Sequence, residues 1–303
     1  MREKRIKRSV LLTAIIMLAV MSAGLGDDWP TFGHDTERTG WAFEEDKLSV
    51  KNAGNLELKW KIHLDNKALS MTALTAPLVA SDVTTPEGVK TLVYVAGSSN
   101  HVFAVDAATG KLAWSHDFTA HVSPAYEGMW LCPNNLNATP VIERRAGLIY
   151  ALNAEGRLFG LDLGDGKERF GPVQFVPPYS KVWSLNLFEG VIYTSISQNC
   201  ADTPSGIYAT DIRDPNRPVV RALLVDDHGA GVWGRGGPVI SPGMFPISAP
   251  FHRHSHGIPR HRSRTAFAIL ATGWRSASAK RRRVRDMRKP AHESCPHQPQ
   301  LEF

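Results

Sequence analysis

Short runs of Val, Ile, Leu, Tyr and Phe alternate with polar turns through the central part of the chain. One pair of runs covers 91–97 and 101–106, and a second pair covers 147–152 and 157–163. Runs of β-branched and aromatic residues bounded by Gly, Asn, Ser or Asp are typical of strands that are buried on both faces. The pattern therefore predicts an all-β fold built from short antiparallel strands.

The two pairs of runs are copies of one repeat. Three landmarks recur at a single spacing of 56 residues, namely Asp106 and Asp162, Gly110 and Gly166, and Trp114 and Phe170. A looser third copy covers 190–197 and 206–215. Four short strands recurring about every 50 residues are typical of the blades of a β-propeller. The alternative is a generic meander with accidental similarity, and the shared spacing of three landmarks argues against it.

Each part of the repeat has a physical role. The Asp that ends a strand can accept hydrogen bonds from backbone N–H groups two or three residues later, and the Gly of the same turn adopts a positive φ without steric cost. The aromatic residue after that Gly offers a large flat surface that can wedge between neighbouring repeats. The positions expected to carry the repeat structure are Trp60, Asp106, Thr109, Gly110, Trp114, Asp162, Gly166, Phe170 and Asp211.

The segment from Ala104 to Trp114 resembles the blade signature of the pyrroloquinoline quinone (PQQ) repeat β-propeller family, which is quinoprotein alcohol dehydrogenase-like. Residues 28–40 and 231–238 also resemble parts of that family. The resemblance implies a partial propeller over 27–243, made of four-stranded antiparallel blades. It also implies that Trp60 takes the place of Trp114 on an outermost strand that completes the last blade.

The repeats account for three complete blades, at about 75–118, 138–176 and 182–225, and for the first strand of a fourth blade. A full ring of the resembled family has seven or eight blades. The propeller is therefore expected to be incomplete, and a protein partner or a second chain could complete it.

The resemblance implies a full-length oxidoreductase that acts on an alcohol or a sugar with PQQ and Ca²⁺. Such dehydrogenases hold Ca²⁺ on a Glu and an Asn, and an Asp acts as the general base. No residue here sits in a motif that matches these roles, so the catalytic and cofactor-binding residues stay unassigned and this chain is expected to be inactive. Cys132 to Asn135 and Asn186 precede inner strands and could face the axis, or they could be turn and cap residues. The alternative is a non-catalytic scaffold, as in outer-membrane assembly.

The first 26 residues have the parts of a signal peptide. Basic residues at 2–8 precede an apolar run at 10–23, and small residues follow the run. The run is short for a membrane span, which needs roughly 20 residues, although an uncleaved anchor is the alternative. The prediction is export to the periplasm or beyond. A disulfide between Cys132 and Cys200 would be permitted there, but their spacing does not indicate one.

The last part of the chain, 244–303, is rich in Arg, His, Pro and Ser and shows no strand pattern. We expect a disordered tail and hypothesise a frameshift, which resequencing the DNA across codons 235–260 would test. The tail contains alternate histidines at 252–256 and a basic run at 280–285, but no cysteine or carboxylate pattern completes a metal site. Because the formal net charge of +6 comes from the two basic ends, the body is acidic and no nucleic-acid partner is predicted.

Overall fold

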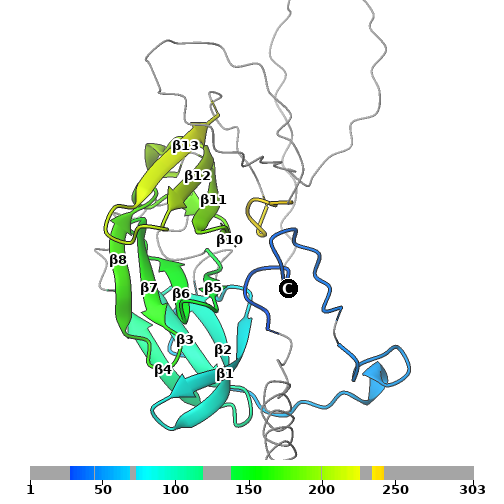
Figure 1. The fold of residues 1–303 in the computed structure, drawn as a ribbon. Coiled ribbons are helices and arrows are strands. Elements are labelled where there is room, and N and C mark those ends of the chain that lie inside the picture. The colour runs from blue at the N-terminus through cyan, green and yellow to red at the C-terminus, as the bar shows by residue number, and fades with distance from the viewer. Residues whose placement is uncertain are drawn as a thin grey trace, which may run out of the picture. The chain divides into compact units, whose positions relative to one another are not determined.

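The computed structural model of the chain describes residues 28–43, 45–68, 73–118, 138–198, 200–225 and 234–241. The signal peptide predicted at 1–26 and the tail predicted at 244–303 lie outside the described residues. The described residues form three antiparallel β-sheets and two short 3-10 helices, without an α-helix (Figure 1). The predicted all-β fold of four-stranded antiparallel blades is confirmed.

Each sheet is a meander of strands that follow one another in the sequence (Figure 1). The first sheet contains β1 (Leu78–Thr85), β2 (Gly88–Gly97), β3 (His101–Asp106) and β4 (Leu112–Asp117). The second contains β5 (Val141–Glu143), β6 (Leu148–Leu152), β7 (Arg157–Asp162) and β8 (Glu168–Gln174). The third contains β9 (Lys181–Val182), β10 (Asn186–Phe188), β11 (Val191–Ser197), β12 (Gly206–Asp211) and β13 (Val219–Leu224). The 3-10 helices are η1 (Ala53–Asn55) and η2 (Cys200–Asp202).

The first strand of the third sheet is interrupted. Both β9 and β10 pair with β11, and Ser184 and Leu185, which lie between them, leave the ladder. The backbone N–H of Leu185 donates instead to the carbonyl of Thr139 at 2.9 Å, and that of Ser184 donates to the carbonyl of Arg235 at 3.4 Å. The interruption therefore connects the third sheet to the segment before β5 and to residues 234–241.

Two hydrophobic clusters fill the space between the sheets. One joins the first sheet to the second, and the other joins the second sheet to the third. Neighbouring residues of β6 divide between them, because consecutive side chains of a strand point to opposite faces: Ile149 lies in the first cluster and Tyr150 in the second. The second sheet is thus buried on both faces, as the apolar runs predicted.

The N-terminal segment 28–36 lies against the first strands of the three sheets and against residues 234–241. Its hydrogen bonds reach these elements in chain order. Trp29 and Val79 exchange backbone hydrogen bonds at 2.9 and 3.0 Å, and Ile142 N–H donates to the Pro30 carbonyl at 2.8 Å. The Thr31 hydroxyl donates to the Leu185 carbonyl at 3.1 Å. Ile240 N–H donates to the Thr36 carbonyl at 2.9 Å. One short segment therefore fixes the first strands of successive repeats relative to one another.

Two side chains strengthen this segment. The Asp28 carboxylate accepts a hydrogen bond from Ser81 N–H at 2.7 Å and pairs with Arg144 Nε at 2.7 Å. The guanidinium of Arg38 donates to the carbonyls of Phe32 and Leu185 at 2.6 and 2.8 Å. Burial lowers the pKa of Arg38 to about 10, so the group keeps its charge at neutral pH.

Candidate functional site

The turn after β3 is built around Asp106. Its Oδ1 accepts a hydrogen bond from Ala108 N–H at 2.8 Å, and its backbone carbonyl accepts one from Gly110 N–H at 2.8 Å. Desolvation alone would raise the pKa of Asp106, but the Ala108 N–H and the Lys90 ammonium 3.3 Å away outweigh it and lower that pKa. The carboxylate is therefore held ionised as a structural acceptor within the turn.

Asp162 forms the same turn after β7. Its Oδ1 accepts from Gly164 N–H at 2.8 Å, and its carbonyl accepts from Gly166 N–H at 3.0 Å. Asp211, at the end of β12, accepts instead from the backbone and guanidinium of Arg213. The three aspartates thus occupy the ends of the third strands of their sheets. Thr109 is exposed, and its hydroxyl accepts a hydrogen bond from Lys111 N–H at 3.3 Å.

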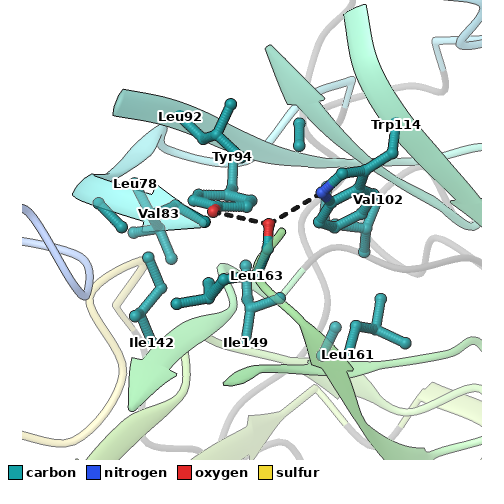
Figure 2. Packing of buried hydrophobic residues seen from close by; sticks show 14 of the residues in the cluster. Leu78, Val83, Leu92, Tyr94, Val102, Trp114, Ile142, Ile149, Leu161 and Leu163 are labelled. Atoms are coloured by element: carbon teal, nitrogen blue, oxygen red, sulfur yellow. Dashed lines mark hydrogen bonds between the residues drawn. The ribbon is translucent and has the colours of Figure 1, made fainter. Parts of the chain in front are cut away.

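Two tryptophans dock on the turns of the following repeat. Trp114 donates from Nε1 to the carbonyl of Leu163 at 2.9 Å, and Leu163 directly follows Asp162 (Figure 2). Trp60 donates in the same way to the carbonyl of Ala107 at 2.9 Å. Trp60 lies outside the strands of the three described sheets, but it contacts the first sheet as Trp114 contacts the second.

The turn glycines make room for these indoles. A Cβ added to Gly110 would lie 2.6 Å from ring carbons of Trp60, and a Cβ added to Gly166 would lie 2.5 Å from Trp114. Both glycines have a positive φ, at 72° and 69°. Glycine is therefore required twice over, by the backbone conformation and by the tryptophan above it.

Tyr94 of β2 shares the acceptor that Trp114 uses. Its hydroxyl donates to the Leu163 carbonyl at 3.0 Å, and its ring centroid is 5.8 Å from that of Trp114 (Figure 2). Tyr94 is fully buried, and burial raises the pKa of its hydroxyl. The phenol therefore stays protonated and keeps donating to this carbonyl.

The junction between the second and third sheets is different. Phe170 takes the aromatic position and has no N–H to donate. Tyr150, which corresponds to Tyr94, donates its hydroxyl to Glu143 Oε2 at 3.1 Å. Pro215 is the fourth residue after Asp211, where Gly110 and Gly166 stand in their own turns. A cavity of about 390 Å³ lies at this junction, and Tyr150, Phe170 and Pro215 are among the residues that line it.

Asn186 is the described residue that best tests a cofactor site near the first strands. It is fully buried, its amide N–H groups donate to the carbonyls of Thr36 and Pro238 at 2.9 Å each, and its Oδ1 has no partner. Ca²⁺ takes six to eight oxygen ligands, several of them carboxylates. Within the described ranges no group of three His, Cys, Asp or Glu side chains could hold a metal ion. The two amide N–H bonds make Asn186 a clip between segments, and its Oδ1 is the atom left without a partner.

The cysteines of the chain are partly described. Cys200 begins η2, is buried and is disulfide-bonded. Cys132, with the axial candidates up to Asn135, and Cys295 lie outside the described residues. Through the described part of the chain, no helix is long and apolar enough to cross a membrane.

Comparison with known proteins identifies the repeats. Residues 29–176 match the family model of the glucose/ethanol/alcohol dehydrogenase β-propeller domain. The chain is 29% identical over 163 residues to the quinohemoprotein alcohol dehydrogenase of Comamonas testosteroni, covering 54% of this chain and 19% of that protein. It is 32% identical over 120 residues to the outer membrane protein assembly factor BamB of Yersinia pestis, covering 40% of this chain and 27% of that protein. The chain thus spans about a fifth to a quarter of the length of these relatives.

Two solved structures also align with parts of the chain. The crystal structure of the quinohemoprotein alcohol dehydrogenase from Comamonas testosteroni aligns with a TM-score of 0.44 at 22% identity, over 70% of this chain and 27% of that one. A europium-containing methanol dehydrogenase aligns with a TM-score of 0.47 at 19% identity, over 65% of this chain and 32% of that one. Residues 29–176 belong to the PQQ β-propeller family, as the repeat signature implied.

Several features of the junctions were not apparent from the sequence. The acceptors are backbone carbonyls, which leave no trace in the residue pattern. In the third sheet, Arg221 stands opposite Ala209, as Trp114 stands opposite Ala104. The connection from β12 to β13 is longer than its counterparts, so Arg221 is further from Asp211 along the chain than Trp114 is from Asp106. The length of this connection is the one feature of the sequence that indicates a different contact between the second and third sheets.

The glycine under Trp114 gives a direct test of the docking contact. We expect Gly166→Ala to destabilise the protein more than Gly147→Ala, because both residues have φ near 70° but nothing lies within 4 Å of a Cβ at Gly147. The strain shared by both should cost about 1–2 kcal/mol, and the clash with Trp114 should add about 1–3 kcal/mol. Urea denaturation measures both losses, and equal losses would contradict the docking contact.

The divergent junction predicts coupling between Phe170 and Pro215. We expect Phe170→Trp alone to give no stabilisation, because the Pro215 ring occupies the turn position that is glycine beneath the other indoles. Combined with Pro215→Gly, it should allow the indole to donate to the Ile212 carbonyl. A double-mutant cycle should then show a favourable coupling free energy of about 1 kcal/mol. Additive effects of the two substitutions would contradict this assignment.

Proposed function

We propose that this chain supplies the first blades of an exported quinoprotein-type propeller whose complete form oxidises an alcohol or a sugar with PQQ and Ca²⁺. The observation that carries the proposal is the match of residues 29–176 to the dehydrogenase propeller domain. The relative from Comamonas testosteroni, named for alcohol oxidation, supports it. The docked tryptophans and the N-terminal segment supply the wall of such a propeller.

Most of the cofactor site would come from residues other than those described. The ionised Asp106 is committed to its turn and to Lys90, and Asn186 uses its amide N–H groups as a clip and leaves only its Oδ1 without a partner. We therefore propose that this chain has no dehydrogenase activity by itself. A protein partner or a second chain carrying further repeats would complete the ring. The first strand of a fourth blade would then be residues 234–241, where Ile240 is bound to Thr36 as Ile142 is bound to Pro30.

A second candidate function is a non-catalytic scaffold that binds other proteins. The similarity to the assembly factor BamB favours it, together with the outermost strand of the third sheet. All six residues of β13 are exposed, and they include Val219 and Leu223, which are 48% and 50% exposed. An apolar outer strand of this kind is suited to contact another protein or a further blade.

A chimera distinguishes the two functions. Residues 27–241 of this chain would replace the aligned segment of the Comamonas testosteroni dehydrogenase, and PQQ and Ca²⁺ would be added. If these repeats belong to a dehydrogenase ring, the chimera should bind the quinone saturably and oxidise ethanol with an artificial electron-accepting dye. The parent enzyme and a sample treated with a chelator are the controls. A folded chimera that binds no quinone would favour the scaffold.

Export predicts the state of the cysteines. Disulfides persist in oxidising compartments, and Cys200 is disulfide-bonded. With three cysteines in the chain, protein recovered from the periplasm should contain one free thiol after denaturation, measured by thiol titration. The same protein expressed without residues 1–26 should remain in the cytoplasm with its cysteines reduced. A fully reduced protein in the periplasmic fraction would count against the export proposal.

A further inference from the structure

The junction between the second and third sheets leaves a backbone acceptor unused. At the preceding junction the Leu163 carbonyl accepts hydrogen bonds from both Trp114 and Tyr94. The corresponding carbonyl is that of Ile212, which directly follows Asp211. No described residue donates to it, because Phe170 has no N–H and Tyr150 donates to Glu143. The cavity at this junction includes Ile212 in its wall.

The cavity has the size and walls of a small aromatic site. Its volume of about 390 Å³ lies at the lower end of the range for small-molecule pockets. Leu148, Phe170, Ile212 and Pro215 give it apolar walls. Apolar walls that include an aromatic ring favour a planar aromatic ligand, which stacks or packs edge-on.

The polar groups of the cavity favour a ligand that donates hydrogen bonds. Glu143 forms no ion pair with any described residue, and Tyr150 occupies its Oε2 while no described residue donates to Oε1. The two arginines at the cavity are already paired. Arg169 lies 3.5 Å from Asp162 and 3.6 Å from Asp165, and Arg213 lies 2.9 Å from Asp211. Among the charged side chains that line the cavity, Glu143 is therefore the one without an ion-pair partner in the described residues.

We propose that this cavity binds a small aromatic amine whose ring carries an N–H group. The ring N–H donates to the Ile212 carbonyl and replaces the indole that the chain lacks at this junction. An ammonium group on the ligand pairs with the Glu143 carboxylate. The site lies between two blades and is independent of the proposed dehydrogenase or scaffold function, since it uses only residues of β5, β6, β8 and the connection after β12.

Tryptamine is the probe, because it combines an indole N–H with an ammonium group. Isothermal titration calorimetry with the purified chain should show saturable binding at millimolar ligand. 1-Methyltryptamine, which has no ring N–H, should bind about fivefold more weakly, and indole-3-propionate, which carries a carboxylate instead, should bind more weakly still. Glu143→Gln should weaken tryptamine binding by about tenfold or more, because a hydrogen bond to a charged group is lost.

The variant Phe170→Trp/Pro215→Gly fills the cavity with the chain's own indole and should abolish binding. A chain that binds no tryptamine, or binds tryptamine and 1-methyltryptamine equally, overturns the proposal. Unchanged binding to Glu143→Gln also overturns it, because the ligand would then lie elsewhere. Circular dichroism checks that each variant is folded. If the double variant does not fold, Glu143→Gln and the methylated ligand still decide the outcome.

Discussion

The carbonyl of Leu163 joins the first two sheets. It accepts one hydrogen bond from the indole of Trp114 and another from the hydroxyl of Tyr94, on different strands of the preceding sheet (Figure 2). Both donors and the acceptor are buried, and an unpaired buried group at this place would cost about 1–3 kcal/mol. In the observed alignment of the two sheets both donors reach the same oxygen, and this saving favours that alignment. The apolar cluster around them supplies the burial, and these hydrogen bonds fix the alignment.

The residues around each junction vary together. Where a tryptophan docks, the turn beneath it has a glycine, because a side chain at Gly110 or Gly166 would meet the indole at 2.6 or 2.5 Å. Where the aromatic residue is Phe170, Pro215 stands at the turn position. There the hydroxyl of Tyr150 donates to Glu143, and a cavity lies at the junction. The junction between the second and third sheets is thus packed differently from the other two. It is held by burial, without the hydrogen bond from an aromatic side chain to the turn carbonyl.

The sequence was sufficient for the features that depend on local residues. Apolar runs and turn residues predicted the strands, and the fixed spacing of Asp106 and Asp162 predicted equivalent turns. It was not sufficient for contacts made across long separations. Tyr94 and Trp114 meet Leu163 across 69 and 49 residues, and their acceptor is a main-chain atom that every residue possesses. The unpaired Oδ1 of Asn186 and the contacts of the N-terminal segment depend on the same distant packing. The sequence placed Asn186 before an inner strand and showed that 28–40 resembles a known family, but it predicted none of these contacts.

The contacts that hold neighbouring repeats together do not determine which reaction the protein catalyses or which partner it binds. Docked tryptophans, turn aspartates and apolar clusters act between neighbouring repeats, and they would serve a ring that holds a quinone as well as one that binds proteins. This explains why one stretch of chain is similar both to alcohol dehydrogenases and to an assembly factor. Function must instead depend on side chains that the repeat does not require. Within the described residues, the pattern departs from itself at the interrupted first strand of the third sheet and at the junction of Phe170 with Pro215. In a repeat protein, the positions that depart from the repeat pattern are therefore the first ones to test for a specific function.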